Sequence, residues 1–311
     1  MSKLLVITCP RTEESVPEIE EILEPFGYDV SYHPPDGQGF DSHEMCSILE
    51  KASIAIVGDD EIDASVIDTA KEIKFIIKWG VGMNQIDLDY AEKKSLTVVN
   101  SPSTLSTDVA EYTLLLMLLL LRKTNLVDTE IRNNNWYKPT GERLEGLDIG
   151  FIGFGNIGQS IYERIKNFNL NLFFYDPNVE ESSYDLITKK DLRFIKQKCK
   201  IIILCCSLND ENYYLVDDEF IDELKNFPYI INVSRGQLIR EDSLLSALDG
   251  KKIAGAALDV FEQEPLSADS KLKSYKNVVL SSHNASNTFE ANSDVNGSII
   301  NQLKDWVINN E

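Results

Sequence analysis

Residues 147–158 read LDIGFIGFGNIG, and the order of residue types in this stretch is informative. An apolar run with the composition of a buried strand leads into three closely spaced glycines, and a segment of helical character follows over residues 159–168. The glycines form a G-x-G-x-x-G pattern: Gly153, Gly155 and Gly158. This pattern between a strand and a helix predicts a tight turn that needs close backbone contacts.

Each glycine has a separate expected task in such a turn. Gly153 permits the turn itself, Gly155 lets the backbone approach a pyrophosphate, and Gly158 lets the helix pack closely against the strand. The first turn of the helix would then offer amide donors and the positive end of its dipole to the phosphates. The motif therefore predicts a dinucleotide-binding site.

The next predicted strand, NLFFYD, ends in a carboxylate at Asp176. A carboxylate at this position accepts hydrogen bonds from the adenosine ribose hydroxyls, and its charge opposes a 2′-phosphate. The predicted cofactor is therefore NAD rather than NADP. The alternative interpretation is a tight strand-to-helix turn followed by an ordinary surface aspartate.

Short apolar runs rich in β-forming residues alternate with helical segments along the whole chain, which is typical of βαβ units and parallel sheets. Five runs precede residue 101 and six follow it: LLVIT, YDVSYH, SIAIVG, KFIIKW, LTVVN, IGFIGFG, NLFFYD, IIILCC, YIINVS, IAGAALDV and NVVLSS. Eleven strands are too many for one ordinary sheet. We therefore predict an α/β protein of two Rossmann-like, doubly wound parallel-sheet domains with a cleft between them.

The segments around the two groups of strands predict how the chain is divided. Residues 100–103 read NSPS, a breaker cluster, and a long helix is expected over about 107–123. The last helical segment, 286–309, has no sheet of its own to cover. We expect residues 1–101 plus 283–311 to form a discontinuous substrate-binding domain. Residues 102–282, including the long helix, would form the NAD-binding domain.

Composition excludes several classes of protein. The 311 residues contain 30 Lys and Arg against 51 Asp and Glu, a net charge of −21, which argues against nucleic-acid or anionic-membrane partners. The longest apolar run, 114–121, is far too short to span a bilayer. The five cysteines show no metal-ligand spacing, so we expect no metal site and a reducing, cytoplasmic location.

Three residues with catalytic potential follow three successive predicted strands. Arg235 follows YIINVS, Glu264 follows IAGAALDV, and His283 follows VVLSS. Because the carboxyl ends of parallel strands share one edge, where ligands bind in open α/β sheets, these side chains are expected to meet beside the cofactor. The alternatives are a surface ion pair for the first two residues and a structural role for the histidine.

Several of these motifs together resemble the NAD-dependent D-2-hydroxyacid dehydrogenase family. The resemblance rests on GFGNIG with Asp176, and on NVSRG, LDVFEQEP and SSHNAS. KWGVGMNQID is similar to the family's glycine loop near the substrate, and NSPSTLSTDVAEYTLLLMLLLLR to its long interdomain helix. The ending SHNASNT is most similar to the phosphoglycerate-dehydrogenase-like branch. The resemblance implies hydride transfer between a D-2-hydroxy acid and NAD, and a homodimer formed largely through the long helix.

The resemblance also implies roles for individual residues. His283 would be the general acid and base, Glu264 would orient its ring, and Arg235 would bind the substrate carboxylate and polarise its carbonyl. The backbone amides of Val81 and Gly82 would complete the carboxylate cradle. The residues expected around NAD, besides the three glycines, are Asn156, Ile157, Asp176, Cys206, Val233, Ser234 and Asp259, the last near the nicotinamide amide.

The sequence departs from the family pattern where a substrate phosphate would bind. Basic residues are typical just after the third strand of the first domain, but residues 57–61 read VGDDE. Lys78 and Arg11 are the remaining nearby cations. D-3-phosphoglycerate is the first candidate substrate, and an unphosphorylated 2-keto acid such as hydroxypyruvate or glyoxylate is the second. A non-catalytic, NADH-sensing protein similar to a corepressor is the alternative from a different class.

Overall fold

The computed structural model describes residues 3–101, 105–180 and 184–310, and divides into two compact units. Unit 1 comprises Met1–Leu105 and Asn287–Glu311, and unit 2 comprises Ser106–Ser286. Each unit is built on one parallel sheet, so the predicted α/β class with two doubly wound sheets is confirmed. The first predicted domain boundary adjoins residues 102–104, which lie outside the described residues, and the second was expected at 282/283.

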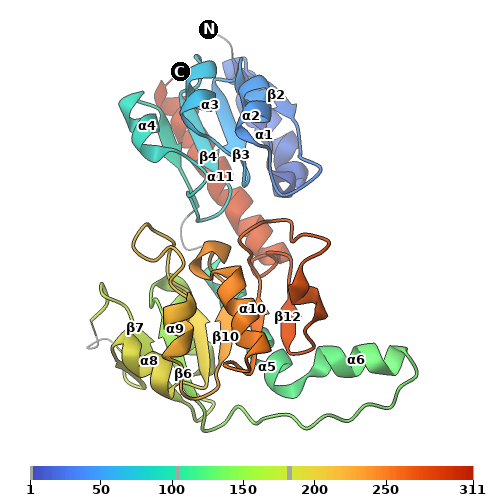
Figure 1. The fold of residues 1–311 in the computed structure, drawn as a ribbon. Coiled ribbons are helices and arrows are strands. Elements are labelled where there is room, and N and C mark those ends of the chain that lie inside the picture. Colours follow the sequence, from blue (N-terminus) through green and yellow to red (C-terminus); the bar gives the residue numbers. More distant parts are fainter. Residues whose placement is uncertain (1–2, 102–104, 181–183, 311) are drawn as a thin grey trace. The chain divides into compact units, whose positions relative to one another are not determined.

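Unit 1 contains a five-stranded parallel sheet in the order β2-β1-β3-β4-β5 (Figure 1). The order reverses between β1 and β3, so this pair forms a topological switch point. The strands are β1 (Leu4–Ile7), β2 (Asp29–Tyr32), β3 (Ile54–Val57), β4 (Phe75–Lys78) and β5 (Thr97–Val99). The helices are α1 (Val16–Leu23), α2 (Ser42–Leu49), α3 (Ala64–Thr69), α4 (Leu88–Lys93) and α11 (Phe289–Asn310), and a short 3-10 helix spans Pro10–Ser15.

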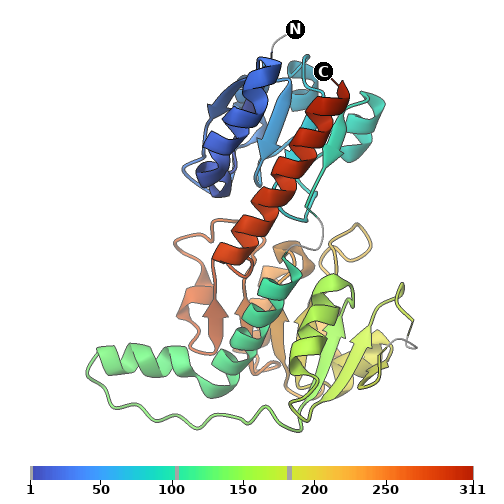
Figure 2. The same cartoon turned by 180° about the vertical axis from the view of Figure 1, so that it is seen from behind.

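Alternating side chains of these strands form two cores, one on each face of the sheet. Leu5 and Ile7 of β1 lie in the core that includes α1 and α11, whereas Val6 lies in the core that includes α2, α3 and α4. This alternation is the two-residue period of a strand buried on both sides. The C-terminal helix α11 contributes Val295 and Leu303, both fully buried, to the first core, and Figure 2 shows it beside α1.

Unit 2 contains a seven-stranded parallel sheet in the order β12-β11-β10-β9-β6-β7-β8. Its strands are β6 (Asp148–Ile152), β7 (Asn171–Tyr175), β8 (Ile187–Lys189), β9 (Ile201–Leu204), β10 (Tyr229–Asn232), β11 (Gly255–Leu258) and β12 (Val278–Leu280). The order reverses between β6 and β9, as in dinucleotide-binding folds. The sequence patterns did not predict β8, because only one of its three residues is buried.

Two layers of helices cover this sheet. The helices α5 (Ser106–Arg122) and α7 (Asn156–Ile165) pack on one face, where residues such as Phe151 and Ile203 are fully buried. The opposite face is covered by α8 (Leu192–Lys198), α9 (Asp218–Asp222) and α10 (Glu241–Asp249). The predicted long helix 107–123 corresponds to α5, and the helix predicted after the glycines begins earlier than expected, at Asn156.

One segment of unit 2 stands apart from these layers. The helix α6 (Thr124–Arg132) buries none of its residues, and Figures 1 and 2 show it and the following segment extending beyond the sheet of its own unit. Trp136 on this segment is 81% exposed. We call residues 124–146 the arm. None of the described helices is long and apolar enough to cross a membrane.

Candidate active site

The three glycines after β6 each meet a different steric requirement. Gly153 has φ +91°, and a Cβ there would lie 2.5 Å from the backbone nitrogen of Cys206. A Cβ at Gly158 would lie 2.9 Å from the carbonyl oxygen of Gly153, because α7 packs closely on the turn. By contrast, a Cβ at Gly155 would meet no atom of the described residues within 4 Å. Packing within the protein therefore explains Gly153 and Gly158, and the approach of a pyrophosphate explains Gly155.

The carboxylate at the end of β7 supports the same turn. Asp176 accepts hydrogen bonds from the backbone amides of Phe154, at 2.7 Å, and Asn178, at 2.8 Å. Its side chain therefore stands directly beside the glycine turn, at the carboxyl edge of the sheet. Asn156 and Ile157 form the first turn of α7, where backbone amides and the helix dipole favour an anionic group. These features fit the pyrophosphate and adenosine ribose of NAD.

The loops after β9 and β10 border the glycine turn. The hydroxyl of Ser234 donates a hydrogen bond to the carbonyl of Cys206. Backbone atoms of Cys206 are the ones that leave no room for a side chain at Gly153. Val233 is buried between these loops. Burial raises the pKa of the Cys206 thiol to about 11, so this side chain is neutral at physiological pH. Of the predicted cofactor residues, Cys206 and Ser234 therefore lie beside the glycine turn, whereas Asp259 directly follows β11.

His283 and Glu264 are paired. The distance from Nδ1 of His283 to Oε2 of Glu264 is 2.7 Å, and the other oxygen of Glu264 accepts the backbone amide of Phe261 at 2.9 Å. Because an ionised carboxylate is only an acceptor, Nδ1 carries the proton and Nε2 is the atom available to a ligand. The His283 and Glu264 side chains are 27% and 20% exposed. The pair is therefore desolvated in part but still accessible.

Arg235 lies at the same edge of the sheet, directly after β10. One guanidinium nitrogen donates to the carbonyl of Ser234 at 2.7 Å, and no described carboxylate pairs with this guanidinium. A Cβ on the next residue, Gly236, would lie 1.8 Å from the carbonyl carbon of Phe261. The loop carrying Arg235 is thus packed against the loop carrying Glu264. The strands β10, β11 and β12 are neighbours, which brings the three predicted catalytic residues to one edge.

Asp259 has a clear structural task. It is 1% exposed, and its carboxylate accepts hydrogen bonds from the Ser281 hydroxyl at 2.6 Å and from the backbone amides of Asn284 and Ala285. The backbone amide of His283 donates to the Asp259 carbonyl at 2.7 Å. His283 itself has φ +53°, a left-handed conformation that costs a non-glycine residue about 1–2 kcal/mol. Asp259 therefore holds the histidine in an unfavourable backbone conformation.

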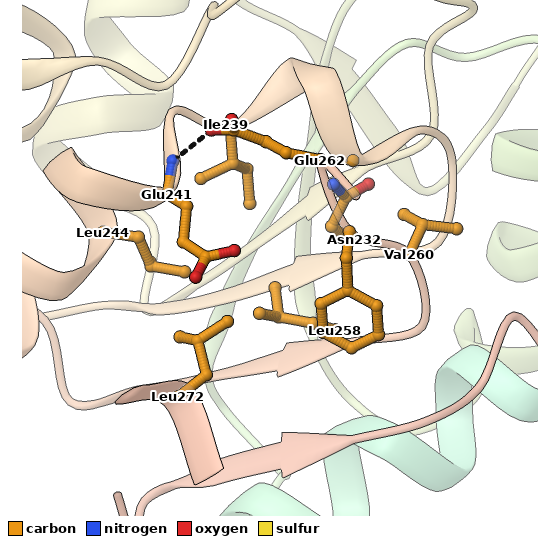
Figure 3. Close-up of a pocket in the computed structure, with 10 residues that line it drawn as sticks. Asn232, Ile239, Glu241, Leu244, Leu258, Val260, Glu262 and Leu272 are labelled. Carbon is orange, nitrogen blue, oxygen red and sulfur yellow. Dashed lines mark hydrogen bonds between the residues drawn. The ribbon is translucent and has the colours of Figure 1, made fainter. Parts of the chain in front are cut away.

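A small pocket is lined in part by Gly236, the residue after Arg235, and by Glu262, two residues before Glu264 (Figure 3). Its walls are mostly apolar, and two acidic residues face it, Glu241 and Glu262. Burial, and then the neighbouring charge of Glu262, raise the pKa of Glu241. The backbone amide of Glu241 donates to the Glu262 carboxylate, the contact drawn as a dashed line. None of the predicted catalytic side chains is among the residues that line this pocket.

The predicted substrate residues of unit 1 follow β4. The side-chain amide of Asn100 donates to the Val81 carbonyl at 2.7 Å, which fixes the loop. No described acceptor pairs with the backbone amides of Val81 and Gly82, so both remain available to an oxyanion. The sequence offered Lys78 as a cation near the substrate, and in the structure this side chain is paired within unit 1. Its ammonium is buried, 3.0 Å from a carboxylate oxygen of Asp59 and 2.8 Å from the carbonyl of Trp79.

Sequence reasoning missed several residues that build these sites. The hydroxyl of Tyr112 on α5 lies 2.8 Å from that of Ser281 and so joins the Asp259 network. The close approach at Gly236 also went unnoticed, although NVSRG contains this glycine. In unit 1, Asn296 of α11 bonds to both Trp79 and Arg11. Gly236, next to Arg235, was the one signal of these contacts available in the sequence. The contacts of Tyr112 and Asn296 join segments distant in sequence, so local patterns could not predict them.

Comparison with known proteins places this geometry in a family. Residues 114–285 match the model of the D-isomer specific 2-hydroxyacid dehydrogenase, NAD binding domain. A glyoxylate reductase of Thermofilum pendens is 36% identical over 257 residues, covering 79% of this chain and 75% of that protein. The chain therefore belongs to the D-isomer specific 2-hydroxyacid dehydrogenase family, and is an NAD-dependent enzyme of that family. The predicted family and cofactor are confirmed.

Solved structures share the complete fold. The D-lactate dehydrogenase of Aquifex aeolicus, crystallised with NAD and lactic acid, has a TM-score of 0.86 at 24% identity and covers 98% of this chain and 96% of its own. The apo D-lactate dehydrogenase of Escherichia coli has a TM-score of 0.81 at 26% identity, with coverages of 99% and 97%. These comparisons do not assign the chain to the phosphoglycerate-dehydrogenase-like branch that the sequence suggested.

Proposed function

We propose that this enzyme reduces a 2-keto acid to the D-2-hydroxy acid, or catalyses the reverse reaction, with His283, Glu264 and Arg235 as its catalytic residues. The 2.7 Å contact between Nδ1 of His283 and Oε2 of Glu264 carries the proposal. This contact fixes the tautomer and the orientation of an imidazole at the edge of the sheet where the predicted cofactor residues also lie.

The proton is handled at Nε2 of His283. In the direction of reduction, NADH supplies a hydride, and the imidazolium donates its Nε2 proton to the oxygen that develops negative charge. In oxidation, neutral Nε2 accepts the hydroxyl proton. Glu264 stabilises the imidazolium through a charge-assisted hydrogen bond and keeps the ring from rotating. Asp259 fixes the backbone of the same loop, so the ring is positioned from two sides.

The substrate's carboxylate is bound by N–H groups that pair with no carboxylate among the described residues. The fork of Arg235 can pair with a carboxylate through two parallel hydrogen bonds and polarise the adjacent carbonyl. The backbone amides of Val81 and Gly82 offer two further donors. All four donors favour an oxyanion, which suits a 2-keto acid.

Two substrate classes have separate support. The ending SHNASNT favours D-3-phosphoglycerate, through its similarity to phosphoglycerate-dehydrogenase-like proteins. The ion pair of Lys78 with Asp59 favours an unphosphorylated 2-keto acid such as glyoxylate or hydroxypyruvate, because this pair removes a cation that a phosphate would need. The relative named glyoxylate reductase also favours the second class. We therefore propose an unphosphorylated 2-keto acid as the substrate.

The experiment that tests the reaction is NADH oxidation with a panel of 2-keto acids, both phosphorylated and unphosphorylated. We expect His283→Ala to lower kcat/KM by about 100-fold or more, the usual scale for loss of a general acid. The matched control is His43→Ala, at an exposed position at the start of α2. Equal activity of His283→Ala and wild type would remove His283 from the mechanism. NADH binding without turnover of any panel member would instead support the sensor alternative.

The proposed assembly is a homodimer. On α5, Leu115 is 45% exposed and Leu118 is 36% exposed, and the arm adds the 81% exposed Trp136. A second copy that covers these apolar side chains would give them a buried environment. Light scattering should therefore report a dimer for the wild type, and Leu118→Glu should shift it toward monomer.

The cysteines are all free, which supports the proposed cytoplasmic location.

A further inference from the structure

A guanidinium without a carboxylate partner lies at the switch point of the unit 1 sheet. Arg11 follows β1 in the 3-10 helix Pro10–Ser15, and among the described residues it forms no ion pair. The helices after β1 and β3, α1 and α3, pack on opposite faces of the sheet, which is the arrangement that defines a switch point at the carboxyl ends of these two strands. Ligands of open α/β sheets bind at such switch points.

This guanidinium is held in place by its own unit. Its central carbon lies 4.6 Å from the ring centroid of Trp79, which is only 4% exposed. Asn296 on α11 accepts from the Trp79 indole nitrogen and donates to the Arg11 carbonyl, both at 2.9 Å. The buried side chain of Asn296 therefore fixes both the indole ring of Trp79 and the backbone of Arg11. Stacking leaves the in-plane N–H groups of arginine free to bind an anion.

The neighbouring charged side chains at this edge have partners of their own. Lys78 pairs with Asp59, and Asp60, which is 1% exposed, accepts hydrogen bonds from Thr8 and from the backbone amides of Gly58 and Phe40. Further carboxylates follow in sequence at Glu61 and in the 3-10 helix at Glu13 and Glu14, so the edge as a whole is not cationic. Such an edge can accept a single extra negative charge at one planar fork, but offers no cationic excess for a phosphate dianion.

We infer that Arg11 is a specificity-determining residue that binds a second carboxylate, at the end of the substrate remote from its 2-keto group. The inference rests on the proposed function, because Trp79 lies two residues before Val81 in the loop proposed to bind the first carboxylate. The substrate class is then a short 2-keto dicarboxylate. Arg11 takes no part in the hydride or proton transfer, and acts by selecting among 2-keto acids.

The test compares two substrates that share five carbons, 2-oxoglutarate and 2-oxopentanoate, which differ in the second carboxylate. We expect the wild type to prefer 2-oxoglutarate, and Arg11→Gln to lower its kcat/KM by about 10- to 100-fold, mainly through KM, while 2-oxopentanoate changes less than about twofold. Arg11→Lys keeps the charge but lacks the planar fork, and should restore part of the preference. Arg143→Gln, at an 83% exposed side chain, is the control.

Several results would overturn the inference. They are a wild type without preference for 2-oxoglutarate, and an Arg11→Gln variant that loses both substrates equally, as a merely structural role would predict. A loss confined to 3-phosphohydroxypyruvate would assign Arg11 to a phosphate instead. If the wild type reduces no 2-keto acid, the proposed function fails, and calorimetric titration with glutarate and pentanoate still decides the inference. Glutarate bound no more tightly than pentanoate, or equally by Arg11→Gln, would refute it.

Discussion

Gly153 and Gly155 stand two residues apart in one motif, yet the structure assigns them different tasks. In Gly153→Ala the new Cβ would enter a left-handed backbone at φ +91° and lie 2.5 Å from backbone atoms of Cys206, which cannot turn aside as a side chain would. The conformation costs about 1–2 kcal/mol and the crowding about 1–3 kcal/mol. We expect the free energy of unfolding to fall by about 2–5 kcal/mol, a loss of roughly 5–15 °C in Tm.

Gly155→Ala should behave in the opposite way. Gly155 has φ −75° and ψ −158°, an extended conformation that alanine adopts freely, and its Cβ would meet no atom of the described residues. The free energy of unfolding should stay equal or rise by about 0.4–1 kcal/mol, because alanine restricts the unfolded chain. The added methyl group would crowd the pyrophosphate, so NADH affinity should fall by about 10-fold or more.

Two measurements separate these outcomes: calorimetric unfolding without ligand, and titration of each variant with NADH followed by its fluorescence. Gly297→Ala in α11 is the control, since its Cβ also meets no described atom within 4 Å and it lies in unit 1. The control should bind NADH like the wild type. The reasoning is refuted if Gly155→Ala loses as much stability as Gly153→Ala, or if it binds NADH with unchanged affinity.

Three further predictions concern residues of unit 2. Asp176→Asn keeps an acceptor for the Phe154 amide but removes the charge, so its ratio of NADPH to NADH affinity should rise with Tm nearly unchanged; continued rejection of NADPH would show that another group sets the choice. Ser281→Ala leaves the buried Asp259 carboxylate with one donor fewer, so unfolding measurements should show a loss of about 1–3 kcal/mol, and an unchanged Tm would contradict this. Glu241 has a raised pKa in the folded state, so the unfolded chain releases its proton more readily than the folded protein does. The wild type should therefore lose stability relative to Glu241→Gln as the pH rises above 4.5, the ordinary pKa of this side chain. A difference in Tm between the two proteins that does not grow above this pH would exclude the effect.

Most of the fold could be predicted from local sequence motifs. Strand composition and the glycine turn were sufficient for two parallel sheets and for NAD, because both depend on residues close together in the sequence. Glu264 and His283 could be expected at one edge because each follows a predicted strand, although their 2.7 Å contact is visible only in the structure. The three-residue strand β8 escaped notice because it offers a single buried side chain.

The environment of charged residues could not be predicted in the same way. Lys78 is the last residue of β4, and Asp59 follows β3 by two residues. Nothing in either local sequence shows that the two side chains form an ion pair. Asn296 joins Trp79 and Arg11, which are separated from it by more than two hundred residues. Such contacts depend on how distant segments pack, and hydrophobic periodicity contains no information about which polar partners will meet.

The placement of α11 has a consequence for how the chain acquires its structure during synthesis. Unit 1 takes its first segment from the beginning of the chain and its last helix from the end, while all of unit 2 is made in between. Until α11 emerges from the ribosome, Leu5, Ile7 and their neighbours on that face of the sheet can be covered by α1 but lack the side chains of α11. The nucleotide-binding half can therefore mature first, and the segment translated before it is fully enclosed only after the segment that follows it.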